Sequence, residues 1–542
     1  MVAQLRTLLI LIVLAIVMIV LGRMVGGLTA PEGPISEAEV DRLIRNLDEP
    51  VGNRIDTLKH AALAGLFVST TEQAHWPTVL EELAMARQYG VHTFVLHVAL
   101  PWGDAPWESY ARLQEALAVV QGAQIWLSLE LTPTAAWLDA HPDEVSTYEF
   151  EGATYPSIGS AAWRSAGSAA IFDVGRTLKT ASPSVSIDGI VLRALEDGNW
   201  SRSMGYDRSP ANERAFGDWV RRKYETVEML TETWGDDYTS FDEARVPDPP
   251  TDTTGTFFRE SRHVDYMEYL NEMTANAVSF FADCAREAFG DSAKVYALYG
   301  ECFGRPLPEH GQWAIGRTLA ESVDGLALNL DRQFRSLGDT GGEAGPSTVP
   351  VLRGKRWVLL DDTRTGIGWN ASTNSVFKPA GFEVRTVSPA YDRNLLNAAM
   401  EQGGVFWSDV RGQGNFLEPS LWDYFASRVP VIDELQNAAS VASRTALIVL
   451  DERSMAYVAD GERVGVNLIN GTRRAIRQSG VSFGYVLLDD LLDGRAPEAR
   501  VFIFPNLFRV EESVRERLHA YFAEHGAAAI WLYAPNAAGS DT

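Results

Sequence analysis

Eight short apolar segments, each followed by a stretch with helical periodicity, are the feature that most constrains the fold of this chain. Strands that read as continuous apolar runs are buried on both faces, and such strands form parallel sheets covered by helices. Eight β/α units in succession close into a (β/α)8 barrel, whose active sites lie at the carboxyl ends of the strands. The predicted strands are 64–70, 93–98, 123–129, 189–195, 294–298, 325–330, 356–360 and 404–407.

A second, smaller α/β pattern begins at about Arg444, after the eighth unit. Its apolar segments alternate with helical stretches at 467–479 and 511–524, which predicts a smaller open α/β domain. The domain contains no cysteine, and we expect its role to be structural. The predicted strands are 445–451, 485–490, 500–506 and 528–535.

The N-terminus carries a targeting signal. Residues 7–22 are uncharged and apolar and follow Arg6, which favours a cytoplasmic N-terminus and translocation of the rest of the chain. A cleaved signal peptide is one interpretation, but Pro31 directly after Ala30 disfavours cleavage, so an uncleaved transmembrane anchor is preferred. We therefore expect a single-pass protein of the cell membrane whose catalytic domain is periplasmic or extracellular.

Four regions follow from these patterns. They are a signal anchor at 1–25, a linker with an amphipathic helix at 26–58, the barrel at 59–440, and the second domain at 441–542.

The charge balance excludes one class of partner. The chain has 47 Lys and Arg against 72 Asp and Glu, and its net charge of −25 repels the phosphate backbone of nucleic acids. Cys284 and Cys302 are too few for a disulfide scaffold or a four-cysteine metal site, so we expect core thiols. The nine histidines show no HExxH or similar ligand spacing, and we predict no metal and no cofactor.

Three long segments of the barrel carry a shared set of motifs. Residues 121–145 read QGAQIWLSLELTPTAAWLDAHPDEV, and residues 215–238 read AFGDWVRRKYETVEMLTETWGDDY. Residues 70–102 run from a Glu-Gln pair through a helix into a strand that ends near Trp102. In their order along the chain, 70–102, 121–145 and 215–238, the segments resemble glycoside hydrolase family 42, the β-galactosidase family, and such long matches are more specific than a short motif. The resemblance implies a glycosidase barrel followed by a glutamine-amidotransferase-like domain, with an oligo- or polysaccharide substrate.

The resemblance also implies two catalytic carboxylates at strand ends. In such glycosidases one carboxylic acid protonates the leaving oxygen, and a second carboxylate attacks or stabilises the oxocarbenium-like centre. The matching positions are Glu196 in DGIVLRALEDGNW, as acid/base, and Asp361 in KRWVLLDDTRTGIGWN, as nucleophile. Asp197 would raise the pKa of Glu196 by like-charge repulsion, which suits an acid that stays protonated near neutrality. A carboxylate that is only solvated or caps the next helix is the alternative for Glu196.

The chain departs from the family pattern at several positions. Asp361 stands where the family has glutamate, which withdraws the carboxylate by about 1.5 Å. This shift is significant because retaining enzymes need about 5–5.5 Å between the carboxyls and inverting ones about 6.5–9.5 Å. Leu195 replaces an asparagine that binds the sugar 2-hydroxyl, and Ala161 stands in place of an arginine, which is absent or displaced to Arg164. The zinc-binding cysteine cluster of the family is also missing.

Aromatic and acidic side chains near strand ends are the predicted sugar-binding residues. The apolar faces of a pyranose stack on indole rings, although large barrels also bury tryptophan for packing alone. The candidates are Trp76, Trp102, Trp137, Asp197, Trp200, Glu301, Trp369 and Trp407. Other side chains near predicted strand ends are Glu72, Trp107, Glu130, Tyr299, Asp331 and Asp409.

Three functions remain open at this point. The first is a membrane-tethered β-glycosidase, and the second is a catalytically degenerate barrel that binds glycan, for example in exopolysaccharide assembly. Leu195, Asp361 and Ala161 separate these two, because they lie where the family has catalytic and sugar-binding residues. The third is a different reaction on the same scaffold, since fold does not fix function. The sequence predicts neither the sugar nor the oligomeric state.

Overall fold

The computed structural model describes most of the chain after residue 63. The described residues are 64–68, 75–103, 109–147, 154–194, 200, 206–250, 257–304, 306–320, 322–331, 334–335, 337–363, 383–409, 411–438, 444–459, 464–533 and 535–538. The predicted anchor at 1–25 and linker at 26–58 lie outside these ranges, as do Glu196, Asp197 and Trp369. Within the described ranges, no helix has the length and apolar character needed to cross a membrane.

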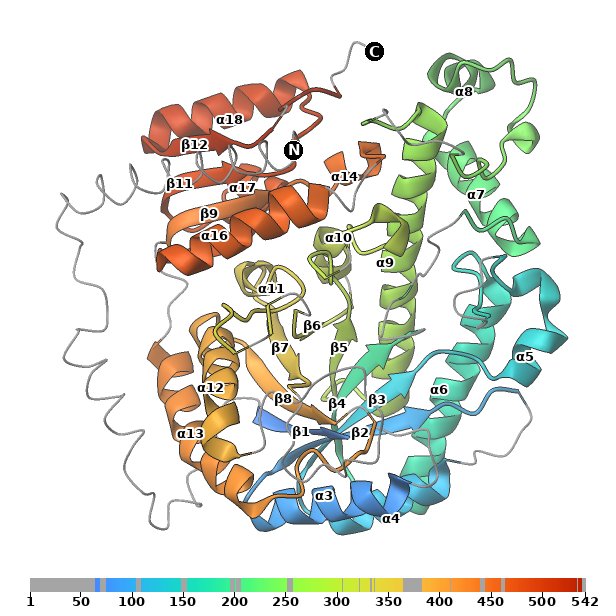
Figure 1. Cartoon of the computed structure of the whole chain (residues 1–542). Coiled ribbons are helices and arrows are strands. Elements are labelled where there is room, and N and C mark those ends of the chain that lie inside the picture. The colour runs from blue at the N-terminus through green and yellow to red at the C-terminus, as the bar shows by residue number, and fades with distance from the viewer. Residues whose placement is uncertain are drawn as a thin grey trace, which may run out of the picture.

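Eight parallel strands close into a barrel in sequential order, β1 to β8 (Figure 1). The predicted (β/α)8 fold is therefore confirmed. The strands are β1 (Ala64–Val68), β2 (Thr93–Ala99), β3 (Gln124–Glu130), β4 (Ile187–Arg193), β5 (Lys294–Leu298), β6 (Gly325–Asn329), β7 (Arg356–Asp361) and β8 (Gly404–Asp409).

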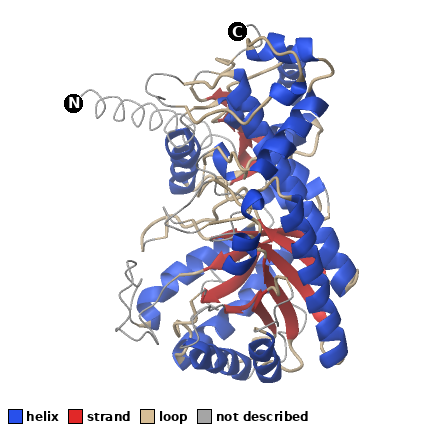
Figure 2. Ribbon diagram, turned by 90° about the vertical axis from the view of Figure 1, so that its right-hand side faces the viewer, coloured by secondary structure: helices blue, strands red, loops and turns tan. Residues whose placement is uncertain are grey.

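Helices cover the outside of the barrel (Figure 2). Several begin at a side-chain cap: Ser160, Ser209 and Thr226 each accept a hydrogen bond from the backbone N–H three residues later. The helices are α3 (Trp76–Gln88), α4 (Tyr110–Val119), α5 (Ala135–Ala140), α6 (Ala161–Ala181), α7 (Pro210–Lys223), α8 (Val227–Trp234), α9 (Ser261–Phe289), α10 (Ile315–Ala320), α11 (Thr348–Leu352), α12 (Val384–Met400) and α13 (Pro419–Ala438).

The side chains that face the barrel axis form a small apolar core of their own. Strand side chains alternate between the two faces of a sheet, so every second residue of each strand contributes to this core. Gly189 makes room for the largest member, because a Cβ at this position would lie 2.3 Å from the Trp126 ring. The inner core consists of Phe67, Val95, Trp126, Val191, Tyr296, Leu298, Ala327, Val358, Leu360 and Phe406.

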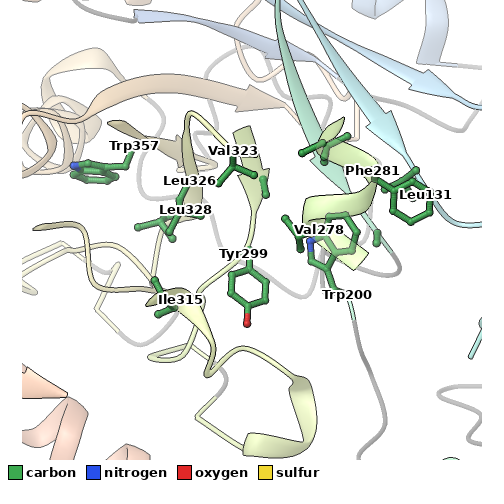
Figure 3. Packing of buried hydrophobic residues seen from close by; sticks show 14 of the residues in the cluster. Leu131, Trp200, Val278, Phe281, Tyr299, Ile315, Val323, Leu326, Leu328 and Trp357 are labelled. Carbon is green, nitrogen blue, oxygen red and sulfur yellow. The ribbon is translucent and has the colours of Figure 1, made fainter. Parts of the chain in front are cut away.

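A larger apolar core lies between the strands and the helices. Figure 3 shows part of it, where Trp200 and Tyr299 lie among aliphatic side chains and Phe281 of α9. Both cysteines, Cys284 and Cys302, are buried here and free. The prediction that they are core thiols is confirmed.

A second sheet of four parallel strands follows the barrel, in the order β10-β9-β11-β12. It agrees with the small open α/β pattern predicted after Arg444, while its likeness to an amidotransferase-like domain stays a prediction. The elements are β9 (Arg444–Leu450), α14 (Ser454–Tyr457), α16 (Gly471–Ser479), β10 (Phe483–Leu487), α17 (Leu488–Leu492), β11 (Ala499–Phe504), α18 (Glu512–His525) and β12 (Ala528–Trp531).

Polar contacts join the second sheet to the carboxyl ends of β5 and β6, beside α16 in Figure 1. Arg473 of α16 is fully buried, and its ion pair with Asp331 after β6 has an N–O distance of 2.8 Å. The Arg473 guanidinium also lies 3.9 Å from the centroid of the Phe303 ring. Arg477 donates to both carboxylate oxygens of Glu343 at 3.0 Å. The second sheet is thus built into one side of the barrel mouth.

Candidate active site

Polar side chains lie beyond the inner apolar core at the carboxyl ends of the strands. Residues two positions apart on a strand face the same side of the sheet. Val95, Trp126, Val191 and Phe406 belong to the inner core, so the inward series continues with His97, Ser128, Arg193 and Ser408, and then with Glu130 on β3. Because the active sites of (β/α)8 enzymes lie at this end, these residues define the candidate site.

Arg193 lies against the apolar floor of this site. Its guanidinium carbon is 5.6 Å from the centroid of the Phe67 ring. Its Nε atom is buried and has no hydrogen-bond partner among the described residues. Glu130 is its register neighbour on β3, and the Glu130 carboxylate accepts a hydrogen bond of 2.6 Å from Thr132. Burial raises the pKa of Glu130, and the nearby charge of Arg193 acts in the opposite direction.

His97 and Ser128 are register neighbours on β2 and β3. Among the described residues, neither Nδ1 of His97 nor Oγ of Ser128 has a hydrogen-bond partner, although both atoms are buried. Burial, with a smaller contribution from the charge of Arg193, lowers the pKa of His97 to about 3. His97 is therefore neutral at physiological pH. Since buried polar atoms nearly always find a partner, these atoms on adjacent strands are free to bond to a buried water or a bound molecule.

Asp361, the predicted nucleophile, lies on the other face of the sheet. Its register neighbour is Trp407, which stacks on Phe425 of α13 with the ring centroids 4.1 Å apart. The Asp361 carboxylate accepts hydrogen bonds from the Thr363 backbone N–H (3.0 Å), the Thr363 hydroxyl (2.6 Å) and the Asn394 amide (3.0 Å). It is 1% exposed, and burial raises its pKa. This carboxylate therefore faces α12 and not the barrel axis.

Asp362 is the next member of the inward series that contains Val358 and Leu360. Its two carboxylate oxygens lie 2.9 and 3.2 Å from the Arg335 guanidinium. Arg335 also donates to the backbone carbonyl of Leu330 at 3.1 Å, which fixes the guanidinium between the ends of β6 and β7. Both side chains are partly exposed, at 22% for Arg335 and 27% for Asp362. A partly exposed carboxylate with a fixed counter-charge thus occupies the end of β7.

The structure places the described tryptophan candidates in packing positions. Trp102 and Trp137 lie side by side in the outer core, with their ring centroids 5.9 Å apart. Trp200 is 1% exposed and donates to the carbonyl of Leu298. Trp407 is buried under α13, as described above. Trp76 lies in the helix layer, where it donates to Glu115 of α4 at 2.6 Å.

The other described acidic candidates support the backbone. Glu301 accepts the N–H of Asn329 at 2.9 Å and so ties β5 to β6. Asp409 accepts the N–H groups of Arg411, Gly414 and Asn415 in the turn after β8. Asp331 is paired with Arg473, and the Tyr299 hydroxyl donates to the carbonyl of Gly311 at 2.8 Å.

A cavity of about 1020 Å³ lies at the opposite, amino-terminal end of the barrel. Its lining includes the strand starts at Ala64, Thr93 and Gln124. The active sites of (β/α)8 enzymes lie at the carboxyl ends of the strands, so we do not assign the site to this cavity. Within the described residues, no three His, Cys, Asp or Glu side chains gather in a way that could hold a metal ion.

The sequence prediction missed Arg193, His97 and Ser128 as members of the site. The available signal was the two-residue period counted from the strands. His97 and Arg193 are charged or polar residues inside apolar segments, FVLHVAL and GIVLRAL. A polar side chain in a strand that is buried on both faces points either to the barrel interior or to a partner in the helix layer.

The closed barrel, with polar side chains gathered at its carboxyl ends, places the chain among the (β/α)8 proteins. The comparisons are more specific. The family model of glycoside hydrolase family 42, described as beta-galactosidase, matches residues 199–298. This segment includes α7, α8, α9 and β5. A search among curated proteins finds no match to the sequence.

Solved structures of glycosidases share the fold. The polyextremophilic β-galactosidase of the Antarctic haloarchaeon Halorubrum lacusprofundi has a TM-score of 0.62 at 17% identity, covering 86% of this chain and 72% of that one. The β-galactosidase of Bacillus circulans sp. alkalophilus has a TM-score of 0.58 at 13% identity, covering 87% and 71%. The apo exo-carrageenase of Bacteroides ovatus has a TM-score of 0.57 at 12% identity, covering 88% and 65%. At these identities, the likeness establishes a β-galactosidase-like fold.

Proposed function

We propose that this protein is a glycoside hydrolase that cleaves β-glycosidic bonds with two carboxylates. The observation that carries the proposal is the match of residues 199–298 to the family 42 model, within a barrel that has the same fold as β-galactosidases. The polar side chains at the carboxyl ends of β2, β3, β4 and β7 support it, because glycosidases need such groups around the anomeric carbon.

In this proposal Glu196 is the general acid/base, and Asp362 takes the role first predicted for Asp361. Glu196 lies outside the described residues, and its role rests on the motif that contains it. Asp362 is favoured over Asp361 because it belongs to the inward series, whereas the three hydrogen bonds of Asp361 hold that carboxylate under α12. Arg335 supplies the counter-charge that an ionised nucleophile needs.

The proposal includes location. The apolar segment 7–22 would anchor the chain in the cell membrane, with the barrel on the periplasmic or extracellular side. Alkaline phosphatase fused after Pro34 should be active, and activity only of a reporter that requires the cytoplasm would reject this location.

A pair of adjacent substitutions tests the catalytic assignment. Asp362→Asn should lower kcat on aryl β-glycosides by a factor on the order of 10⁴, because the nucleophile is lost while the shape is kept. Asp361→Asn should retain kcat per folded molecule but lose about 1–3 kcal/mol of stability. The new amide N–H group would face Thr363 or Asn394 groups that now donate hydrogen bonds to the carboxylate. The opposite result, with Asp361→Asn inactive and Asp362→Asn active, would return the role to Asp361.

A second function, glycan binding without hydrolysis, is favoured by one observation. Both oxygens of Asp362 are already bonded to Arg335, so attack on a sugar requires one of these contacts to open. In this case the wild type should be inert on aryl β-glycosides while glycan binding persists in both Asp362→Asn and the wild type.

A further inference from the structure

Three adjacent strands place hydrogen-bonding atoms without partners at the floor of the candidate site. They are Nδ1 of His97 on β2, Oγ of Ser128 on β3 and Nε of Arg193 on β4, all buried and unpaired within the described chain. The register makes His97 a neighbour of Ser128, and Glu130, one inward step further along β3, a neighbour of Arg193. The three atoms therefore belong to one continuous part of the barrel wall.

Among the described residues, the charge of this group is unbalanced. Arg193 is partly buried, and its Nε atom is buried without a partner among them, which is costly because the lost hydration is not replaced. Glu130 is the nearest described acid on the adjacent strand, yet it forms no ion pair with Arg193, and its bond from Thr132 directs the carboxylate along β3. No counter-charge for Arg193 is therefore found among the described residues, which do not include Glu196 and Asp197.

The group is also rich in donors. The Arg193 guanidinium and the Ser128 hydroxyl both donate, and a neutral His97 ring donates through one nitrogen. The low pKa of His97 keeps its ring neutral, so it adds a dipole to the site without a second positive charge. One fixed positive charge with neutral donors beside it matches a singly charged oxyanion, as Arg matches a carboxylate or a sulfate ester.

We propose that His97, Ser128 and Arg193 form a subsite for an acidic substituent of the sugar, a carboxylate or a sulfate ester, at the floor of the barrel. This inference rests on the proposed function in that the ligand is a glycan. It adds the substrate class: an acidic sugar, whose negative charge compensates Arg193. The inner core beneath Arg193, including Phe67, is apolar and offers no competing counter-charge.

Calorimetric titration with monosaccharides tests the subsite without turnover. The probes are glucuronate, galacturonate and galactose 6-sulfate, with glucose and galactose as neutral counterparts. Each acidic sugar that fits should bind at least about tenfold more tightly than its neutral counterpart, because a charge-assisted hydrogen bond replaces a lost hydration shell. Preference for uronates alone, or for the sulfate alone, identifies which oxyanion the subsite accepts.

Matched variants locate the effect. Arg193→Gln should abolish the preference for the acidic sugar, and Ser128→Ala, which removes a hydroxyl without a partner and leaves folding intact, should reduce it by a few fold. Arg176→Gln is the control, because Arg176 is 72% exposed on the outer face of α6. Equal affinities for acidic and neutral sugars, or an unchanged preference in Arg193→Gln, would overturn the inference.

The outcomes separate this inference from the proposed function. Hydrolysis of neutral aryl β-glycosides together with equal binding of acidic and neutral sugars would reject the acidic subsite and leave the hydrolase standing. Selective binding of an acidic sugar that requires Arg193, with no hydrolysis of any aryl glycoside, would support the subsite and reject the hydrolase.

Discussion

The two sides of the barrel mouth differ in how their charged side chains are paired. On the side of β2 to β4, His97, Ser128 and Arg193 present buried atoms that have no partner among the described residues. On the side of β6 and β7, the described carboxylates of Asp331, Glu343 and Asp362 are paired with Arg473, Arg477 and Arg335.

This difference separates two reasons for a polar residue at a strand end. On the β6 and β7 side, each arginine is paired with a carboxylate, and two of the arginines come from α16. Nε of Arg335 and Nε of Arg477 are nevertheless also buried without a partner among the described residues. On the β2 to β4 side, the described residues leave no ion pair for Arg193 and no partner for the buried atoms of His97 and Ser128. A site that awaits a ligand is expected to look like the second case.

The largest effect is expected from Arg473→Met. This change leaves Asp331 buried without a counter-charge, and removing one partner of a buried pair costs about 3–5 kcal/mol. Urea unfolding of the wild type and the variant measures the difference. Arg474→Met is the control. Arg474 is 54% exposed, and its N–O distance to Asp339 is as long as 3.9 Å, so the loss of this weak surface pair should cost less than about 1 kcal/mol. Equal losses for both variants would remove the contrast.

The pH dependence of stability should be altered by Glu452→Gln. Glu452 accepts hydrogen bonds from the N–H groups of Ile315 and Gly316 at the start of α10, and burial raises its pKa to about 7. Between about pH 4.5 and 7 the folded state therefore holds a proton that the unfolded chain has released. The contribution of Glu452 to the free energy of unfolding falls as the pH rises through this range. The loss should be about 3 kcal/mol and should vanish in the variant. Parallel curves for both proteins would contradict it.

The opposite sign is expected on the β2 to β4 side. Burial lowers the pKa of His97 to about 3, so the unfolded chain takes up a proton below about pH 6.5 while the folded state does not. The contribution of this group to stability is complete above pH 6.5 and falls as the pH drops toward 3; between pH 7 and pH 4.5 the loss should be about 2.5 kcal/mol. His97→Gln should remove that loss. The free energy of unfolding at pH 7 and pH 4.5, compared between variant and wild type, measures it.

The smallest change in stability is expected from Arg193→Met. The substitution removes an unpaired guanidinium from an apolar floor, so the free energy of unfolding should stay constant or rise by up to about 1 kcal/mol. The same change of residue type thus has opposite consequences on the two sides of the mouth. A loss as large as that of Arg473→Met would mean that Arg193 has a structural partner and would break the comparison.

The barrel strands could be predicted from the sequence because each is a short apolar run between helical segments. The fifth strand, 294–298, was predicted with its observed bounds. The fourth was predicted at 189–195 but forms at Ile187–Arg193. It begins earlier because the Asp188 carboxylate accepts the backbone N–H of Ile125 and so brings a polar residue into the sheet.

The direction of the side chains at the end of β7 could not be predicted in the same way. The segment WVLL (357–360) is apolar on both faces, so the sequence shows no alternation from which to decide between Asp361 and Asp362. Only the pairing of Asp361 with Trp407, and its bonds to Asn394, reveal the outward face. The tryptophans were interpreted as sugar platforms for a related reason, since a strand-end indole has the same sequence signal whether it is buried or exposed.

The ion pair between Arg473 and Asp331 joins residues that are 142 positions apart, and this separation has a consequence for biosynthesis. During translation, β2, β3 and β4 can come together and finish their side of the mouth long before residues 444–533 have been made. Asp331 and Glu343 must wait for Arg473 and Arg477, which are made after all eight strands of the barrel. Until then, Asp331 and Glu343 lack these counter-charges, so we expect the second sheet to dock late in folding.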